Sequence, residues 1–219
     1  FGTMARLAHG GLRKGVERAA KIFSESIDDK AARFEIKIFP DCEIGELPDD
    51  NRIVVIKEAW TDAQVREWLC SLGCYVTLST SEGFGLCPLH ALACATPVIA
   101  TFATGHAEYL TTEVAWPISY DLVRAEEVYP GNKYYTGYWH YPNEQSAKAA
   151  YRKAYSWMYN NQQRDSRNPR KVALDPSHIL MQDLLPMQIK CMQQAQKFTY
   201  KNTAEGIRRI LNDNFGLHL

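Results

Sequence analysis

Short apolar runs and helical periodicity alternate along the first 120 residues of the chain. Apolar or alternating runs predict strands at residues 1–7, 34–39, 53–56, 75–78, 97–100 and 114–118. Helical spacing of apolar residues predicts helices at residues 14–26, 62–72 and 88–95. Thr61 is placed to act as the N-cap of the second helix. Strands that alternate with helices are typical of an α/β fold with a doubly wound, Rossmann-like parallel sheet.

The remaining residues follow a different pattern. Residues 121–141 are rich in tyrosine and tryptophan, and we interpret them as an ordered loop packed on the domain. A helix is predicted at 143–159, and a long amphipathic helical stretch at 186–211 with a break near 199–202. We therefore divide the chain into a Rossmann-like core (1–120), an aromatic loop with a helical insertion (121–185) and a C-terminal helical segment (186–219). We also expect the continuous apolar run at 53–56 to be covered on both faces of the sheet.

The charge balance excludes some classes of function. Lys plus Arg and Asp plus Glu both total 25, so the net charge is zero, and no general nucleic-acid binding is expected. No apolar run is long enough for a transmembrane segment. The six cysteines match no zinc spacing, which favours buried free thiols in the cytoplasm, although one or two disulfides stay open. The basic stretch 160–171 leaves a peripheral contact with a membrane open as well.

Three segments with binding chemistry follow predicted strands. They are the glycine turn with Arg6, Gly10, Gly11 and Lys14, the segment from Lys57 to Trp60, and the turn from Glu82 to Leu86. Ligands of an open parallel sheet bind outside the carboxyl ends of the strands, so we expect these segments to meet there.

The third turn enters a predicted helix through Pro88, and a helix start offers unpaired N–H groups and a positive dipole end to an anion. Arg6 and Lys14 add full positive charges, which also suit a phosphate. Glu82 would repel a phosphate and suits neutral hydroxyl groups instead. Cations and amides beside one carboxylate therefore fit a sugar joined to a diphosphate.

Several motifs of the chain resemble those of a known family. They are Glu82-Gly-Phe84-Gly85, Ala91-Leu-Ala93 with Pro97-Val-Ile-Ala100, Arg6-Leu7 with Lys14-Gly15, Thr104-Gly105-His106-Ala-Glu108, and Phe198-Thr-Tyr200. As a set, they resemble the C-terminal domain of the retaining glycosyltransferases of family 4 (group 1), which have the two-domain GT-B fold. The resemblance runs along most of the chain and is weakest at residues 121–186.

The resemblance implies a hexosyltransferase-type enzyme and a role for each matching residue. Arg6 and Lys14 would clamp the donor diphosphate, and Glu82 would hold the hydroxyls of the donor sugar. Lys57 and Trp60 would flank the nucleotide base. The other donor-binding positions are Gly10, Gly11, Gly83, Phe84, Gly85 and Leu86. The nucleotide sugar is the substrate, and we expect no metal and no other cofactor.

The chain departs from the family pattern in two ways. His90 stands where the family has its second glutamate, which grips the ribose, and we predict that His90 faces the ligand cleft. The complete fold has two domains, so we expect a separate N-terminal domain that brings the acceptor site. The C-terminal helices would cross to that domain.

Two other functions stay open at this point. The first is a binding or scaffold module that has kept the fold and lost catalysis. The second is a sugar-nucleotide epimerase or a phosphorylase with the same fold. The sugar, the base and the acceptor are also left open.

Overall fold

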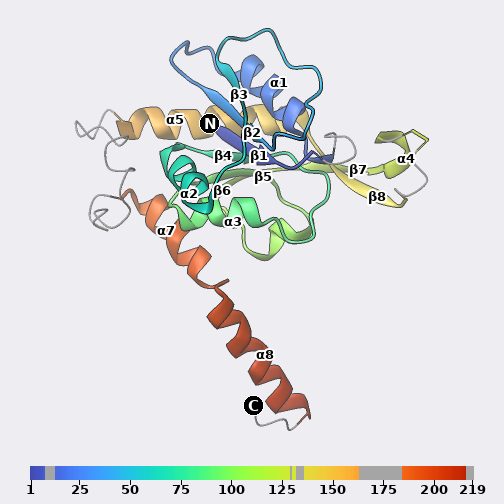
Figure 1. The fold of residues 1–219 in the computed structure, drawn as a ribbon, viewed down its shortest axis with the longest axis vertical. Coiled ribbons are helices and arrows are strands. Elements are labelled where there is room, and N and C mark those ends of the chain that lie inside the picture. Colours follow the sequence, from blue (N-terminus) through green and yellow to red (C-terminus); the bar gives the residue numbers. More distant parts are fainter. Residues whose placement is uncertain (8–12, 129, 132–135, 163–183, 216–219) are drawn as a thin grey trace.

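The computed structural model describes residues 1–7, 13–128, 130–131, 136–162 and 184–215. Its centre is a six-stranded parallel sheet with the order β3-β2-β1-β4-β5-β6 (Figure 1). The strands are β1 (Gly2–Ala5), β2 (Phe34–Ile38), β3 (Ile53–Lys57), β4 (Tyr75–Thr77), β5 (Val98–Thr101) and β6 (Ala115–Ile118). This order is that of a doubly wound, Rossmann-like sheet, so the predicted fold class is confirmed.

Helices cover both faces of the sheet (Figure 1). The helices among the described residues are α1 (Val16–Ser26), α2 (Asp62–Ser71), α3 (Leu86–Ala93), α5 (Glu144–Gln162), α7 (Pro186–Gln196) and α8 (Tyr200–Phe215), with two short ones, η2 (Thr104–Glu108) and α4 (Ala125–Val128). Helices α1 and α5 pack together over one face, and α2, α3 and α7 cover the other.

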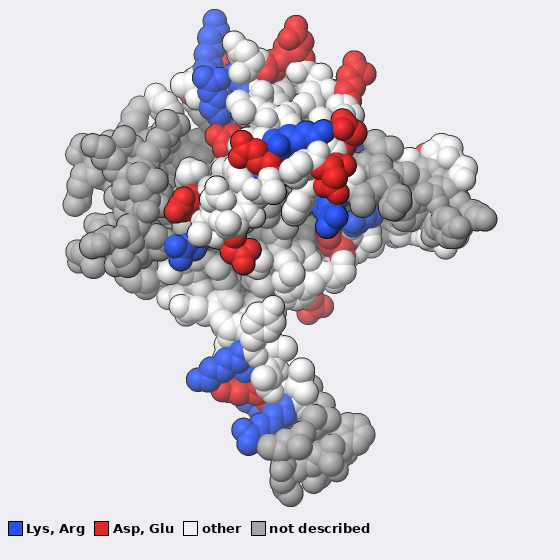
Figure 2. All heavy atoms as spheres, in the orientation of Figure 1, with Lys and Arg blue, Asp and Glu red and all other residues white. Residues whose placement is uncertain are grey.

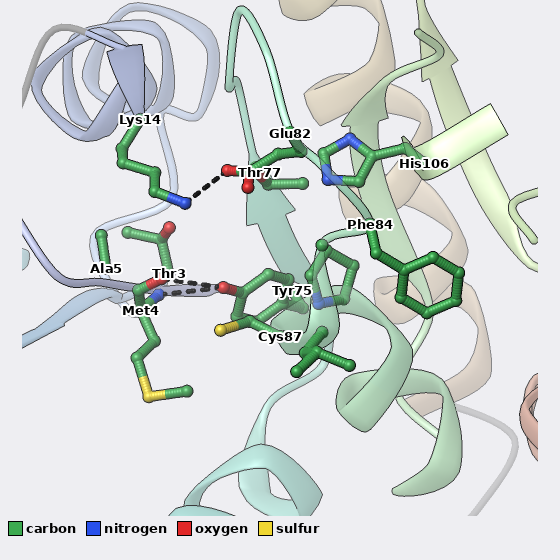
Figure 3. A pocket seen from close by; sticks show the side chains of 13 residues that line it. Thr3, Met4, Ala5, Lys14, Tyr75, Thr77, Glu82, Phe84, Cys87 and His106 are labelled. Carbon is green, nitrogen blue, oxygen red and sulfur yellow. Dashed lines mark hydrogen bonds and ion pairs between the residues drawn. The ribbon is translucent and has the colours of Figure 1, made fainter. Parts of the chain in front are cut away.

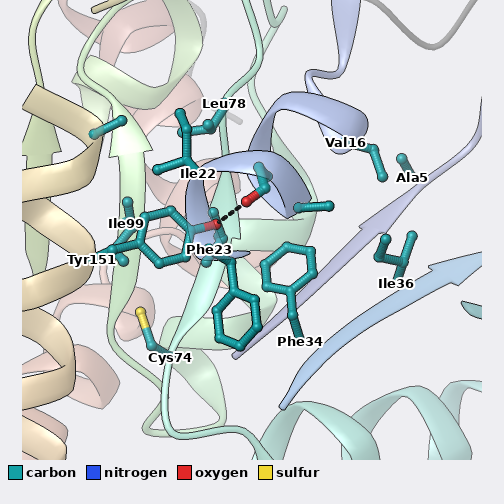
Figure 4. Packing of buried hydrophobic residues seen from close by; sticks show 14 of the residues in the cluster. Ala5, Val16, Ile22, Phe23, Phe34, Ile36, Cys74, Leu78, Ile99 and Tyr151 are labelled. Carbon is teal, nitrogen blue, oxygen red and sulfur yellow. Dashed lines mark hydrogen bonds between the residues drawn. The ribbon is translucent and has the colours of Figure 1, made fainter. Parts of the chain in front are cut away.

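Helix α5 completes the core on the first face. Tyr151 is fully buried, and its ring lies among Phe1, Phe23 and Phe34. The Tyr151 hydroxyl donates a hydrogen bond to the carbonyl of Ala19 in α1, at 2.9 Å (Figure 4). A segment that the sequence places outside residues 1–120 therefore belongs to the core of the sheet.

Helix α7 has the same role on the second face. Cys191 and Ala195 are buried in the cluster that contains Leu92 and Tyr109. Beyond α7, the chain continues into α8, which projects away from the domain in Figure 1.

The predicted elements of the core are confirmed, with ends that shift by a few residues. Thr61 caps α2 through a capping box with Gln64, as its position predicts. The C-terminal helical stretch is broken between Gln196 and Tyr200, close to the predicted break.

The expectation for the run at 53–56 was wrong. β3 is an edge strand, and Val54 and Val55 are 41% and 39% exposed. A run of β-branched residues favours a strand, but it does not reveal whether the strand lies at the centre or at the edge of the sheet.

The predicted loop at 121–141 was also wrong. β7 (Tyr120–Arg124) and β8 (Tyr138–Pro142) pair as an antiparallel two-stranded sheet on either side of α4. Trp139 is buried against Ala125, whereas Leu122 and Tyr138 are exposed. The aromatic residues are strand formers here, so only part of this segment packs inward.

All six cysteines are free thiols; Cys42, Cys74 and Cys191 are buried, and the other three are partly exposed. Among the described residues, no helix is long and apolar enough to cross a membrane.

Candidate functional site

A pocket of about 320 Å³ opens at the carboxyl ends of β1 and β4. These two strands are neighbours at the centre of the sheet, where the strand order reverses. The crevice at such a reversal is the usual ligand site of an open α/β sheet. Thr3, Met4 and Ala5 of β1 line the pocket together with Tyr75 and Thr77 of β4.

Lys14 and Glu82 meet at the rim of this pocket (Figure 3). Lys14 lies just before α1, and Glu82 follows β4. The Lys14 Nζ donates a hydrogen bond to Glu82 Oε1 at 2.5 Å. Only 26% of the lysine side chain and 13% of the glutamate side chain are exposed, so both charged groups of this ion pair are partly removed from water. Two residues that are 68 positions apart, from two of the segments that we expected to meet at this edge, are thus in contact.

Two further side chains hold the carboxylate of Glu82. The Ser79 hydroxyl donates to Glu82 Oε1 at 2.9 Å, and Arg13 Nη1 lies 3.7 Å from the same oxygen. Burial alone would raise the pKa of Glu82, but Lys14, Ser79 and Arg13 outweigh it, so this pKa lies below that of an ordinary carboxyl group. Glu82 is therefore ionised at neutral pH and acts only as a hydrogen-bond acceptor.

The N-terminus of α3 forms another wall of the pocket. Gly85 is its N-cap, with φ of 81°, and a glycine has no side chain that could cap the helix. Leu86, Cys87 and Pro88 of the first turn line the pocket. Backbone N–H groups at such a helix start suit an anion.

The loop after β5 packs directly on the Glu82 turn. The Glu82 N–H donates to the Thr104 hydroxyl at 3.1 Å, and the Gly105 N–H donates to the Glu82 carbonyl at 3.1 Å. A Cβ atom at Gly105 would lie 2.4 Å from the Gly83 carbonyl oxygen, so only glycine permits this approach. The loop thereby places His106 in the pocket lining.

Among the polar and charged side chains around Glu82, sequence reasoning missed Arg13, Ser79 and His106. Arg13 directly precedes Lys14, so it lies within a segment that we had already singled out for its charges and glycines. Ser79 lies between a predicted strand and the glycine turn and carries no signal of its own. His106 lies inside a motif that we quoted, but the motif does not reveal that its ring points into the pocket.

Other predicted site residues lie outside the pocket lining. Arg6 Nη2 is 3.5 Å from Asp41 Oδ2, and both side chains are largely exposed. Lys57 donates to Glu43 at 2.8 Å, and the Trp60 indole donates to Glu58 at 2.7 Å. Lys57 is the last residue of β3, and Arg6 and Trp60 follow β1 and β3, so all three lie at the expected edge of the sheet. Their roles stay predictions.

His90 is exposed on α3, so its ring is not buried in the core. It follows Leu86 by four residues, which places both on one face of the helix, but only Leu86 lines the pocket. Its ligand-facing role therefore stays a prediction. Gly10, Gly11 and most of the basic stretch 160–171 lie outside the described residues.

Within the described part of the chain, no group of three His, Cys, Asp or Glu residues is placed to hold a metal ion. On the face drawn in Figure 2, positive and negative side chains are intermingled.

The family follows from a comparison with known sequences. The profile of the family "Glycosyl transferases group 1" matches residues 1–124, which is more than half of the chain. The chain therefore belongs to the group 1 glycosyltransferases, as its motifs indicated. A comparison with curated proteins found no match.

Solved structures of glycosyltransferases share the fold. The GtfA/B complex aligns with a TM-score of 0.55 at 14% identity, over 97% of this chain and 36% of that one. A glycosyltransferase from Rickettsia africae aligns with a TM-score of 0.55 at 13% identity, over 97% and 47%. The pneumococcal O-GlcNAc transferase GtfA in complex with UDP and GlcNAc aligns with a TM-score of 0.50 at 18% identity, over 97% and 35%.

These alignments confirm the Rossmann-like half of a GT-B fold. The chain spans about a third to a half of the length of these structures.

Proposed function

We propose that this chain supplies the donor-binding half of a retaining glycosyltransferase. The donor is a nucleoside-diphosphate sugar, and the acceptor is a hydroxyl group. The carrying observation is the Lys14–Glu82 pair beside the N-terminus of α3, at the strand reversal of the sheet. This site combines a cation and free amides with a carboxylate, which are the partners of a diphosphate and of a sugar.

The ion pair suggests how the donor binds. Lys14 and Glu82 form an ion pair in which their charges neutralise each other. In our proposal, the diphosphate takes over Lys14, and the released carboxylate of Glu82 accepts hydrogen bonds from sugar hydroxyls. Arg6 joins Lys14 on the diphosphate, and Lys57 and Trp60 flank the base.

The same charges would assist the reaction. As the bond between the sugar and the phosphate breaks, negative charge grows on the leaving diphosphate, and Lys14 stabilises it. The leaving phosphate oxygen accepts the proton of the incoming hydroxyl, which attacks from the same side. A second domain would bring the acceptor, and the reaction would need no metal.

Nucleotide binding tests this proposal. We expect one of UDP, GDP and ADP to raise the melting temperature of the chain, and UDP is the first choice because the similar O-GlcNAc transferase was solved with UDP. Lys14→Gln should weaken this binding at least tenfold, since a hydrogen bond to a charged group contributes about 1.5–3 kcal/mol. Isothermal titration calorimetry measures both.

Lys21→Gln is the matched control. Lys21 lies in α1, which begins shortly after Lys14, but its side chain is exposed and its Nζ lies 3.8 Å from Glu25 Oε1, away from Glu82. It should leave nucleotide binding unchanged. If no nucleotide binds, or if the two variants behave alike, the donor site is wrong.

A module that binds the donor without catalysis is the second candidate. The exposed His90 in place of the family's second glutamate favours it. Release of the nucleoside diphosphate only when an acceptor is present would support the transferase. A large gain of activity in His90→Glu would support the second candidate, because it would mean that the histidine of the wild-type chain had cost the site its activity.

A further inference from the structure

His106 is a buried histidine inside the proposed donor pocket. It lies in η2, its side chain belongs to the pocket lining, and only 1% of the residue is exposed. Figure 3 shows its ring beside Glu82, opposite the end of Lys14. Neither the family motif nor the proposed clamp uses this side chain.

Among the described residues, one ring nitrogen of His106 has a hydrogen-bond partner, and the other has none. Nδ1 lies 3.3 Å from the carbonyl oxygen of Thr101. A carbonyl can only accept, so Nδ1 carries the proton. In the neutral ring, Nε2 then has a lone pair and can only accept a hydrogen bond. Nε2 is shielded from solvent and has no hydrogen-bond partner among the described residues. A buried acceptor without a partner is costly, which marks a place for a ligand group.

The surroundings keep the ring in this position. A Cβ atom at Gly85 would lie 2.5 Å from the Nε2 and Cδ2 atoms of the ring. Tyr109 packs edge-on against the ring and donates its hydroxyl to the Gly85 carbonyl. Gly85 and Tyr109 thus hold the ring on these sides, and His106 itself belongs to the lining of the pocket.

The chemistry of Nε2 selects the partner. Burial lowers the pKa of His106, the carbonyl of Thr101 and the charge of Glu82 act in the opposite direction, and Lys14 adds to the lowering. The ring is therefore neutral at neutral pH. In a neutral ring whose Nε2 is an acceptor, Nε2 cannot donate a hydrogen bond to phosphate oxygens, which are acceptors themselves. Together with the carboxylate of Glu82, it forms a pair of acceptors that suits a group with several hydroxyls.

We propose that His106 binds the sugar of the donor by accepting a hydrogen bond from one of its hydroxyls at Nε2. This inference rests on the proposed function, because it concerns the same pocket. It adds a residue that contacts the sugar rather than the nucleotide. Lys14 then binds the diphosphate, while Glu82 and His106 bind the hydroxyls of the sugar.

The test compares two ligands in calorimetry, with and without the sugar. The probes are UDP and UDP-glucose or UDP-N-acetylglucosamine, or GDP or ADP and its glucose conjugate if that base binds. His106→Leu, which fills the space without an acceptor, should weaken binding of the nucleotide sugar about three- to tenfold, the range of one hydrogen bond. It should leave binding of the free nucleotide unchanged. His106→Gln places an acceptor near Nε2 and should restore most of the loss.

A second measurement needs no variant. In the wild-type chain with ¹⁵N-labelled histidine, the nucleotide sugar should shift the Nε2 resonance of His106, and the free nucleotide should not. Equal effects of His106→Leu on both ligands, or an unchanged Nε2 resonance, would overturn the assignment while the donor site stands. If the wild-type chain binds neither ligand, the proposed function itself fails.

Discussion

His106 couples the pocket to the stability of the fold. An unfolded histidine titrates near pH 6.5, whereas burial lowers the pKa of His106 in the folded chain. Above about pH 6.5, both states are neutral at this residue. As the pH falls further, the unfolded chain binds a proton that the folded chain does not, so stability is lost until the pH passes the folded pKa. Glu82 and Lys14 face the ring with opposite effects on its charge.

We therefore expect His106→Gln to flatten the fall of unfolding free energy below about pH 6.5, by up to about 1.4 kcal/mol per pH unit. Urea unfolding at several pH values measures this slope. His90→Gln is the control, because it removes an exposed imidazole and shows how the loss of a histidine by itself changes the unfolding free energy. A His106→Gln profile parallel to that of the wild type would contradict the lowered pKa.

At the same scale, sequence reasoning singled out Lys14 and Glu82, but neither the ion pair between them nor the side chains that support it. Lys14 and Glu82 were predictable because each follows a strand in a motif with glycine. Arg13, Ser79 and His106 were missed because their roles depend on how three loops pack against one another. That packing includes contacts such as Gly105 against the Gly83 carbonyl, which no local spacing encodes.

At the scale of elements, the turn from Glu82 into α3 requires one of its two glycines. Gly85 has a φ of 81°, and a Cβ atom there would meet the ring of His106 at 2.5 Å. Gly85→Ala should therefore destabilise the chain by about 2 kcal/mol or more, from backbone strain and overpacking together. Urea unfolding at neutral pH measures this loss.

Gly83→Ala is the matched control in the same turn. A Cβ atom at Gly83 would meet nothing within 4 Å, so this variant should stay close to the wild type in stability. Equal losses in the two variants would mean that the turn needs flexibility rather than the left-handed backbone and the close contact at Gly85.

Elements with a strong period were predictable, and those set by their neighbours were not. Thr61 and the periodic residues after it define α2 locally, through a capping box. The position of β3 at the edge and the pairing of β7 with β8 depend on residues distant in the sequence. The aromatic content of residues 121–141 fits a strand as well as a packed loop, so composition alone did not decide between them.

At the scale of the whole molecule, one sheet with two covered faces explains why the site lies where it does. The strand order reverses between β1 and β4, and the loops after these strands carry Lys14 and Glu82. Helices α5 and α7, which come late in the sequence, close the two faces and hold this arrangement from behind. The chain thus has its own core, and α8 lies outside it.

The contrast between α7 and α8 leads to a prediction about the end of the chain. Tyr200 is 96% exposed and Ile207 54%, whereas Phe198 still packs on Phe84 and Tyr109, with ring centroids 6.1 and 5.9 Å away. Truncation after Thr199 should therefore change the unfolding free energy by less than about 0.5 kcal/mol, as for surface changes.

Truncation after Leu185 also removes the buried Cys191 and should cost several times more, because it uncovers one face of the sheet. Urea unfolding followed by tryptophan fluorescence compares the two. A large loss on the first truncation would mean that α8 folds back onto the domain. A small loss would leave α8, an isolated helix that is marginally stable in water, available to pack against a second domain.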